Sequence, residues 1–367
     1  MRSTATLCEA LAKEGNEVEV FTTDAGLEQA PEISSSRPVD VRGVQVTYFP
    51  RLSGMGIRSP ELERTVRMRI REFDLIHVTG VWQRTAPAAY RAAHAAQVPL
   101  VVSPRGALSR YSWTQRRWRK LAYFFLWERP GLHRAAGLHY TSPMEEKECR
   151  RYRLPARTAV IPNPIDTDFW KRDEPGAARW KSRHGFSPTE KVALYAGRLE
   201  PKKNLPFLIP VLAQAPAWRL VLVGYDERGQ ADILRREAHR LGCAGRFHLL
   251  PAASAEDLRA AYSAADIFVL PSHHENFANA VVEAGACGCP ALLSHQVGCA
   301  EELRANGWVK VLPLETAAWV AALGEGVFRR GLEKSGWKEL VSPKTCATSM
   351  MDLYGKILDD APVQTDR

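Results

Sequence analysis

Short apolar runs alternate with helix-patterned segments along almost the whole chain, and this alternation restricts the possible folds more than any other feature. Six runs in the first half are rich in the β-branched and aromatic residues typical of strands, at 17–24, 44–50, 73–80, 99–106, 136–143 and 157–164. Six more lie in the second half, at 191–199, 219–226, 246–252, 266–273, 290–296 and 307–313. Helix-patterned segments lie between them, among them 204–215, 230–241, 276–287 and 314–330. This pattern predicts parallel sheets that are covered by helices on both faces.

The number of strands indicates two domains. A dozen strands are more than one open doubly wound sheet normally carries, and 367 residues are enough for two domains. A break is expected in IPNPIDTDFWKRDEPG (161–176), where prolines and charges cluster after a strand. We therefore predict an α/β protein with two Rossmann-like, doubly wound parallel-sheet domains at 1–168 and 169–343. Residues 344–367 are predicted to form a C-terminal helix and a polar tail.

The start of the sequence departs from the doubly wound pattern. Such a domain usually begins with a central strand and a glycine-rich turn into its first helix. Here the first pattern is that of the helix itself, from Ser3 to Glu14, followed by Gly15. We therefore expect the first domain to lack its first strand and the loop after it. If that strand is central, ladder groups of both neighbouring strands lose their partners.

Composition excludes several classes of protein. The apolar run LAYFFLW (121–127) is far shorter than the roughly 20 residues that a membrane span requires, and the N-terminus has no apolar signal-peptide core. Of the seven cysteines only Cys287 and Cys289 are close in sequence, which is poor spacing for zinc. We expect reduced, mostly buried thiols in a cytoplasmic protein. The net charge of +9 comes without a groove-reading motif, so nucleic acid is not an expected partner.

Positive charge is concentrated between residues 105 and 134. Eight basic residues accompany one acid, Glu128, and are interleaved with aromatic residues: Arg105, Arg110, Arg116, Arg117, Arg119, Lys120, Arg129 and Arg134, with Trp113, Trp118, Tyr123, Phe124, Phe125 and Trp127. Such a segment suits an anionic membrane surface or an anionic acceptor. It is equally typical of a solvated helix whose aromatic side faces the core.

Two glutamates eight positions apart, Glu275 and Glu283, lie in PSHHENFANAVVEAGACGCP (271–290). A helix that starts near Asn276 would direct the backbone N–H groups of 276–279 out of the ligand edge of the sheet, where they favour an anion. Arg198 and Lys203 follow a neighbouring strand and could close on the same anion. These features predict a cradle for a diphosphate.

The spacing of the glutamates favours an elongated ligand. Eight helical residues rise about 12 Å, whereas the paired carboxylates of a glycoside hydrolase stand about 5–10 Å apart. Glu275 and Glu283 therefore suit opposite ends of one ligand, such as a nucleotide sugar with Glu283 on the ribose and Glu275 on the hexose. His273 and His274 alternate faces of a strand, so we expect no metal there.

Several stretches together resemble the retaining nucleotide-sugar glycosyltransferases of family 4, which have the GT-B fold of two facing Rossmann-like domains. In the second half they are YAGRLEPKKNL (195–205), VLVGYD (221–226), residues 271–292 and VGCAEEL (297–303), and IPNPIDTDFW (161–170) matches between the domains. In the first half DLIHVTGVW (74–82), SPRGALS (103–109) and YTSPMEE (140–146) are similar to members that build bacterial surface polysaccharides. The resemblance covers almost the whole chain.

The resemblance implies a role for each matching residue. Glu275, Arg198 and Lys203 would be catalytic, and the donor would be bound by Gly197, Arg198, Lys203, Gly224, Glu275, Asn276, Phe277, Ala278, Asn279 and Glu283. His77, Trp82 and Arg105 are candidates for the acceptor side. The family retains anomeric configuration and needs neither metal nor cofactor, and its C-terminal helix commonly crosses back to the first domain.

We thus expect transfer of a hexosyl group from a nucleoside-diphosphate sugar to a polysaccharide or lipid-linked oligosaccharide. The protein would be cytoplasmic or peripheral on the inner face of the plasma membrane, through 105–134. Where many members have histidine this chain has Arg105, and Cys299 replaces the second glycine of a pair. The absent first strand and loop leave open a catalytically inactive, donor-binding scaffold subunit. An epimerase of the same fold is a further alternative.

Overall fold

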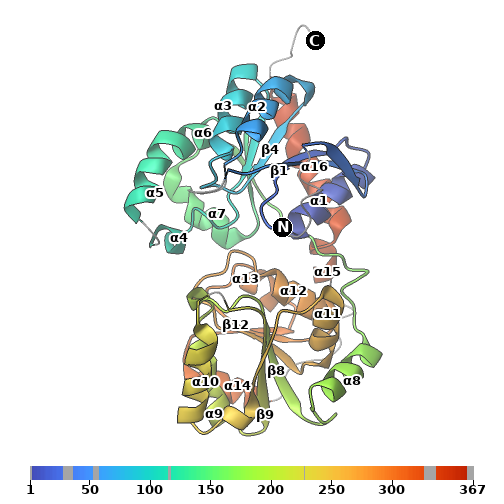
Figure 1. Cartoon of the computed structure of the whole chain (residues 1–367), viewed down its shortest axis with the longest axis vertical. Helices are drawn as coiled ribbons and strands as arrows, with labels where there is room; N and C mark the ends of the chain where they lie inside the picture. The colour runs from blue at the N-terminus through green and yellow to red at the C-terminus, as the bar shows by residue number, and fades with distance from the viewer. Residues whose placement is uncertain are drawn as a thin grey trace. The chain divides into compact units, whose positions relative to one another are not determined.

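The chain folds into two units, and each is built around parallel β-strands with helices packed on them (Figure 1). A computed structural model describes residues 2–27, 36–52, 58–114, 117–226, 228–325 and 336–361. The first unit contains Met1–Pro164 and Pro343–Arg367, and the second contains Ile165–Ser342. The last helix, α16 (Pro343–Asp359), therefore belongs to the first unit. The predicted α/β class with two parallel-sheet units is confirmed.

A six-stranded parallel sheet forms the centre of the second unit, in the order β10-β9-β8-β11-β12-β13. Its strands are β8 (Lys191–Ala196), β9 (Trp218–Val223), β10 (Phe247–Leu250), β11 (Ile267–Leu270), β12 (Ala291–Ser294) and β13 (Val309–Leu312). The four inner strands are almost wholly buried, because nearly all their residues are apolar.

Helices precede, connect and follow these strands. They are α8 (Glu174–Arg183), α9 (Leu208–Gln214), α10 (Gln230–Arg240), α11 (Ala255–Ala264), α12 (Asn279–Ala286), α13 (Ala300–Arg304), α14 (Thr316–Glu325) and α15 (Trp337–Leu340). Single 3₁₀ turns lie at η5 (Pro201–Lys203), η6 (Leu205–Phe207) and η7 (Ala244–Arg246). Residues 326–330 of the predicted helix at 314–330 lie outside the described residues.

The strand order of the second unit reverses between β8 and β11. From β8 the chain continues to β9 and β10 on one side, and then returns to β11, β12 and β13 on the other side. Ligands of open α/β sheets bind beyond the carboxyl ends of the strands at such a reversal. The loops that follow β8 and β11 therefore lie where a ligand is expected.

The strands of the first unit are divided between two sheets, a detail that the sequence did not predict. One has the order β1-β3-β2 and contains β1 (Glu19–Thr23), β2 (Pro38–Val41) and β3 (Val44–Phe49). The other is parallel throughout and contains, in spatial order, β4 (Ile76–Thr79), β5 (Leu100–Ser103), β6 (Gly137–Tyr140) and β7 (Arg157–Val160). Within the described residues, β1 and β4 are end strands of their sheets.

Strand β2 was missed because its local sequence, PVDV, is a poor strand former, and it pairs antiparallel with β3. Its signal is the two-residue turn at Arg42 and Gly43, which have φ 55° and 85°. Two successive positive φ values are those of a hairpin turn whose twist matches its strands.

The helices of the first unit before α16 are α1 (Arg2–Lys13), α2 (Pro60–Arg69), α3 (Ala86–Ala96), α4 (Arg110–Thr114), α5 (Arg117–Tyr123), α6 (Arg129–His133) and α7 (Pro143–Cys149). A π-helix, η3 (Phe124–Glu128), joins α5 to α6, and 3₁₀ turns lie at η2 (Ile70–Glu72) and η4 (Arg150–Tyr152).

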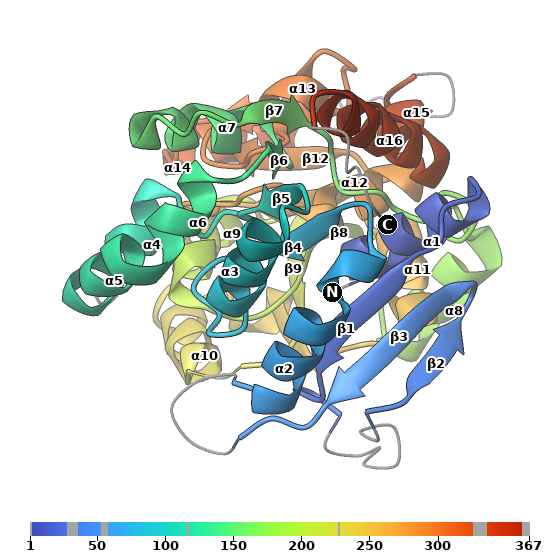
Figure 2. The ribbon, with the colours of Figure 1, turned by 90° about the horizontal axis from the view of Figure 1, so that it is seen from above.

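Helices α1 and α16 lie side by side on one face of the four-stranded sheet (Figures 1 and 2). Leu11 of α1 and Met350 of α16 share a buried cluster with Val101 of β5. A Cβ atom at Gly137 of β6 would lie 2.5 Å from Cδ1 of Ile357, so the absence of a side chain there permits the close approach of α16. The C-terminal helix is thus part of the core of the first unit.

In the basic and aromatic segment at 105–134, some aromatic side chains are packed in the core and others are exposed, while its role at a membrane or acceptor stays a prediction. Trp113 and Phe124 pack with the core of the first unit. Trp118, Phe125 and Leu126 are 82%, 54% and 63% exposed. Arg116 and the side chains of Arg117 and Arg119 lie outside the described part of the chain.

Neither a membrane span nor a disulfide occurs in the described residues. None of the helices there combines the length and the apolar character that crossing a bilayer requires. All seven cysteines are described, and none of them forms a disulfide; Cys8 is partly exposed and the other six are buried. Cys287 and Cys289 are completely buried in the core of the second unit. The same residues contain no cluster of three or more metal-binding side chains.

Candidate functional site

The loops that leave β8 and β9 cross at two glycines, Gly197 and Gly224. A Cβ atom at Gly224 would lie 1.8 Å from the carbonyl oxygen of Gly197, so the backbones can approach only because that position has no side chain. The N–H of Gly197 donates to Val223 O at 2.9 Å, and the N–H of Leu199 donates to Tyr225 O at 3.0 Å. This crossing continues the ladder past the strand ends and fixes the residues that follow at the ligand edge.

Glu275 is held at the same edge by its main chain and its side chain. Its N–H donates to Gln296 O at 2.8 Å and its C=O accepts from Gly298 N at 2.9 Å, which ties the loop after β11 to the loop after β12. The residue is 7% exposed. Its Oε1 accepts a hydrogen bond of 2.6 Å from Lys203 Nζ. Strong hydrogen bonds between ions of this kind fix the direction of both side chains.

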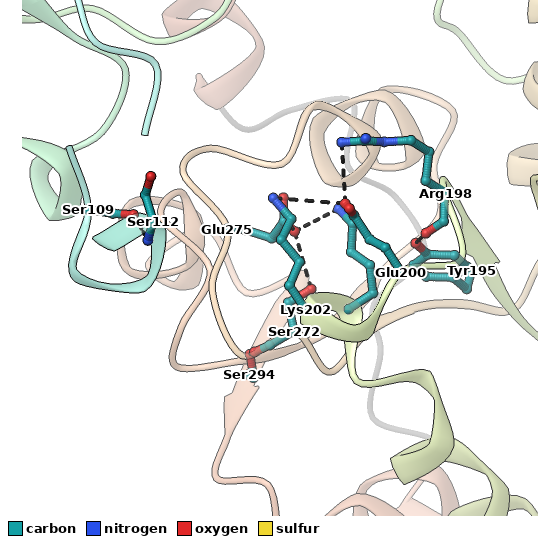
Figure 3. Close-up of polar contacts among 10 residues, drawn as sticks. Ser109, Ser112, Tyr195, Arg198, Glu200, Lys202, Ser272, Glu275 and Ser294 are labelled. Carbon is teal, nitrogen blue, oxygen red and sulfur yellow. Dashed lines mark hydrogen bonds and ion pairs between the residues drawn. The ribbon is translucent and has the colours of Figure 1, made fainter. Parts of the chain in front are cut away.

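Further polar groups surround this ion pair (Figure 3). Lys202 Nζ lies 3.8 Å from Glu275 Oε1, and the Ser272 hydroxyl donates to the same oxygen at 3.5 Å. Lys202 and Lys203 come from η5, the turn after β8, so residues about seventy positions apart meet here. The pair of Lys203 and Glu275, with Lys202 beside it, is called the lysine–glutamate pair below.

Arg198 lies on the open side of this group. Its side chain is 49% exposed, and its guanidinium forms a 3.3 Å ion pair with Glu200. Its carbonyl oxygen accepts a 2.7 Å hydrogen bond from the Tyr195 hydroxyl. Burial, with Glu275 and Glu200 nearby, raises the pKa of Tyr195, so that hydroxyl keeps its proton. The half-exposed guanidinium can therefore turn toward an anionic ligand.

Helix α12 begins at Asn279, and the prediction of a start near Asn276 is wrong. Ala278 has φ 75° and ψ 71°, outside the right-handed helical region, and Glu275 is bridged to Val297. The first-turn N–H groups therefore belong to 279–282 instead of 276–279, and that of Val281 already donates to Ala278 O. Phe277 is 3% exposed in the core, so only its main chain can face a ligand.

Glu283 lies in α12 and is oriented by Tyr262. The Tyr262 hydroxyl donates to Glu283 Oε2 at 3.3 Å, and burial followed by the charge of Glu283 raises the pKa of Tyr262. Because α12 starts only at Asn279, the helical rise of about 12 Å over eight residues does not apply between Glu275 and Glu283. Their separation includes the non-helical turn at Ala278.

The structure thus brings together Arg198, Lys203 and Glu275, beside the crossing of Gly197 and Gly224. Asn276, Ala278 and Asn279 lie in the turn between Glu275 and α12, and Glu283 lies further along that helix. The predicted site residues did not include Glu200, Lys202, Ser272 and Tyr262, which contact them. Glu200 and Lys202 were inside the quoted motif, but no local pattern shows which charge pairs with which. The ligand roles of these residues stay predictions.

The three acceptor-side candidates lie in the first unit. His77 Nδ1 and Nε2 are each 2.6 Å from a hydroxyl, of Tyr354 and Ser103 respectively. Trp82 has φ 71°, and its indole N–H donates to Ala107 O at 2.7 Å. Arg105 has φ 55° and donates to Asn163 Oδ1. His77 and Trp82 are thus fully engaged within their own unit, whereas the Arg105 side chain has a single hydrogen-bond partner among the described residues.

Two domain families account for most of the chain. Residues 2–164 match the family described as "Glycosyl transferase 4-like domain", and residues 177–321 match "Glycosyl transferases group 1". The chain is 29% identical over 217 residues to a D-inositol 3-phosphate glycosyltransferase of Mycobacteroides abscessus, which covers 56% of this chain and 48% of that protein. It is 36% identical over 141 residues to a protein of the same name from Mycobacterium sp., covering 38% and 32%. The chain spans about half the length, or less, of these curated relatives.

Solved structures share the fold over nearly the full length. Sucrose-phosphate synthase from Thermosynechococcus elongatus superposes with a TM-score of 0.74 at 22% identity, over 97% of this chain and 92% of that chain. Anabaena Alr3699/HepE in complex with UDP and glucose superposes with a TM-score of 0.68 at 20% identity, over 97% and 94%. Identities this low show the fold alone, and that fold is GT-B.

Proposed function

We propose that this chain transfers a hexosyl group from a nucleoside-diphosphate sugar to a glycan acceptor. The matches to a glycosyl transferase 4-like domain and to a group 1 glycosyl transferase domain, together with the GT-B fold, support a glycosyltransferase. The observation that carries the proposal is the lysine–glutamate pair, set beside Arg198 at the strand-order reversal of the second unit. Lys203 and Arg198 are cations that could bind a diphosphate, and Glu275 is a carboxylate that could bind sugar hydroxyls.

The cations suit the departing diphosphate. Lys203 Nζ has three N–H donors, of which Glu275 takes one, and the Arg198 guanidinium is half exposed. Negative charge grows on the diphosphate as the bond to the sugar breaks, and fixed donors stabilise that charge most when they need no reorganisation. These residues supply the neutralisation from the chain itself. We therefore propose transfer that is independent of a divalent cation. Retention of anomeric configuration is proposed from the resemblance to the retaining family alone.

The carboxylates suit the two sugars of the donor. Lys203 fixes Glu275 to accept from hydroxyls of the transferred hexose, and Tyr262 turns Glu283 toward ribose hydroxyls. The similar Anabaena structures are complexes with UDP, or with UDP-glucose. Uridine nucleotides are therefore the first donors to test, and guanosine nucleotides the second.

Donor binding is tested by thermal unfolding with a panel of nucleoside diphosphates and nucleotide sugars. A ligand that binds only the folded state raises the melting temperature. We expect one nucleotide to do so, with a smaller rise in Glu283→Ala and an unchanged rise in Glu301→Ala, whose side chain is 70% exposed. No rise with any nucleotide would refute a donor site. Donor binding without turnover on any acceptor would instead indicate a donor-binding subunit.

Turnover tests the remaining claims. Product anomers resolved by NMR should keep the configuration of the donor, and EDTA should leave the rate unchanged. Inverted products would contradict retention, and loss of rate with EDTA that a divalent cation restores would contradict metal independence. Release of free or epimerised sugar without an acceptor would favour a hydrolase or an epimerase.

For the acceptor we propose a polysaccharide or lipid-linked oligosaccharide at the cytoplasmic face of a membrane. Its support is the exposed apolar set around the π-helix, which lies beside basic residues at the start and just after the end of α6: Trp118, Leu121, Phe125, Leu126 and Trp127, with Arg129 and Arg134. Aromatic and basic side chains together suit the interface of an anionic bilayer. The names of the curated relatives point to a smaller, phosphorylated acceptor, so both classes should be assayed.

Co-sedimentation with phosphatidylglycerol vesicles tests the membrane part. Binding should be strong at low salt and weaker in Phe125→Ser/Leu126→Ser, while Leu340→Ser, which is also exposed, should bind as the wild type does. Absence of binding at low salt would show that these exposed residues form no membrane-binding surface. It would not bear on the proposed donor site.

A further inference from the structure

Arg105 is a largely enclosed charged side chain of the first unit that forms no ion pair with a carboxylate of the described residues. Its guanidinium donates through Nη1 to the neutral amide oxygen of Asn163. Its Nε is buried and has no hydrogen-bond partner in the described part of the chain. No ion pair joins Arg105 to a carboxylate among those residues. Enclosing a cation in this way is unfavourable unless an anion meets it.

The nearest carboxylate is already committed elsewhere. Glu145, which is 2% exposed, acts on Arg105 through its charge. One of its oxygens accepts from Gly106 N–H, and the other accepts from the Thr141 N–H at 2.7 Å and the Thr141 hydroxyl at 3.1 Å. Glu145 thus fixes the loop that carries Arg105 without forming an ion pair with it.

The histidines beside Arg105 are neutral, and a directional hydrogen-bond chain determines their tautomers. His139 Nε2 is 2.9 Å from Ile161 O, which can only accept, so that nitrogen carries the hydrogen. In a neutral ring His139 Nδ1 then accepts from the Ser103 hydroxyl at 2.7 Å. Ser103 Oγ in turn accepts from His77 Nε2 at 2.6 Å, and His77 Nδ1 accepts from the Tyr354 hydroxyl at 2.6 Å.

Both rings resist protonation. Burial, with Arg105 nearby, lowers the pKa of His139 to about 3. Burial, followed by His139 and Arg105, lowers the pKa of His77 well below its usual value. Cys8 of α1 and Tyr354 of α16 also lie close enough to affect the pKa of Arg105, and burial raises the pKa of both groups. Arg105 is therefore the one positive charge among these groups near neutral pH.

We propose that the guanidinium of Arg105 binds an oxyanion carried by the acceptor, a phosphate or a carboxylate. Arg105 is partly exposed, and a planar guanidinium meets two oxygens of such a group in one plane, which a lysine ammonium cannot do. The neutral chain from Tyr354 to Ile161 holds the surrounding groups in one protonation state. The inference rests on the proposed function only in assigning the anion to an acceptor, because the site lies wholly in the first unit.

The test uses inorganic phosphate as the probe, measured by calorimetry on the full chain. We expect phosphate to bind at least fivefold more weakly to Arg105→Gln than to Arg91→Gln, which removes an exposed charge from α3 of the same unit. Arg198→Gln should keep this phosphate site, and Arg105→Gln should keep the thermal shift with nucleotide. Equal phosphate affinity in Arg105→Gln and Arg91→Gln would overturn the inference and would leave the donor site intact.

Two further readouts separate an anion site from a structural arginine. Arg105→Gln should melt no lower than the wild type without ligand, because it removes an uncompensated charge and keeps an amide for Asn163. A marked loss of folding would show that the guanidinium is a structural partner and would refute the inference. The sulfate binding that is present in the wild type and lost in Arg105→Gln should have a constant affinity between pH 6 and 8. A fall with rising pH would assign the charge to a histidine instead.

The source of the oxyanion is determined by acceptor competition. A hexose phosphate and a hexuronate are each titrated against bound phosphate, with the unmodified hexose as control. Displacement by only one of the acids identifies the group. Equal weak displacement by all three sugars would show that no acceptor anion is recognised.

Discussion

Replacing Lys203 by methionine should destabilise the second unit, because it leaves the Glu275 carboxylate enclosed without its nearest counter-charge. The Glu275 side chain is 9% exposed and that of Lys203 15%, and the atoms that pair are 2.6 Å apart. Removing one partner of a buried pair costs about 3–5 kcal/mol. Lys202 Nζ remains 3.8 Å from the same oxygen, so the expected loss is about 2–4 kcal/mol.

The control is Lys202→Met. Its side chain is 28% exposed and its separation from Glu275 is larger, so its loss should be below about 1 kcal/mol. The double variant Lys203→Met/Glu275→Gln should recover about 1–3 kcal/mol of the single loss, because no uncompensated charge is then enclosed. The double variant thus separates the loss of the ion pair from the loss of lysine packing.

The assay is hydrogen exchange of β8 peptides by mass spectrometry as a function of urea, without ligand. Two units can unfold separately, and peptides of β8 report the second unit alone. Equal, small losses in Lys203→Met and Lys202→Met would refute the reasoning, since they would show that Glu275 does not depend on Lys203. A double variant no more stable than Lys203→Met would refute it as well.

Three further outcomes follow from the geometry. Gly224→Ala should cost more than about 2 kcal/mol and abolish nucleotide-induced stabilisation, because its Cβ would lie 1.8 Å from the carbonyl oxygen of Gly197; Gly245→Ala, with no atom within 4 Å, should do neither in the same thermal assay. Burial raises the pKa of Glu128 from 4.5 to about 7, so this carboxyl loses its proton at a lower pH in the unfolded chain than in the folded one. The free energy of unfolding should therefore fall by up to about 3 kcal/mol as pH rises from about 4.5 to about 7. Urea unfolding of Glu128→Gln should lack that fall. Tyr354→Phe should cost about 1–3 kcal/mol by leaving a buried imidazole nitrogen unpaired, and faster hydrogen exchange in α16 would report it; unchanged exchange would contradict the hydrogen-bond chain.

Much of the architecture could be predicted because its signals are local. Each of the twelve predicted strand segments coincides with one observed strand, since a buried parallel strand needs a short apolar run whatever its neighbours are. The one additional strand, β2, depends on pairing with β3 across the turn at Arg42 and Gly43. Its composition alone does not indicate a strand.

The candidate site was predicted as a set of residues but not as a network. Arg198, Lys203 and Glu275 were grouped because loops after neighbouring parallel strands meet at one sheet edge. Their partners could not be assigned, since whether Lys203 or Lys202 reaches Glu275 depends on the path of η5 after the glycine crossing. The start of α12 was misplaced because Ala278 adopts a positive φ that its residue type does not signal.

The sequence by itself determined the α/β class, the two parallel-sheet units and the residues that reach the ligand edge, because hydrophobic periodicity and strand order act through neighbours along the chain. Only the tertiary structure decided that Lys203 pairs with Glu275, and that Tyr262 orients Glu283. It alone showed that, within the described part of the chain, the buried Nε of Arg105 has no hydrogen-bond partner. Charge pairing and burial depend on contacts between loops far apart in the sequence, and no local pattern encodes which of several cations is left without a partner.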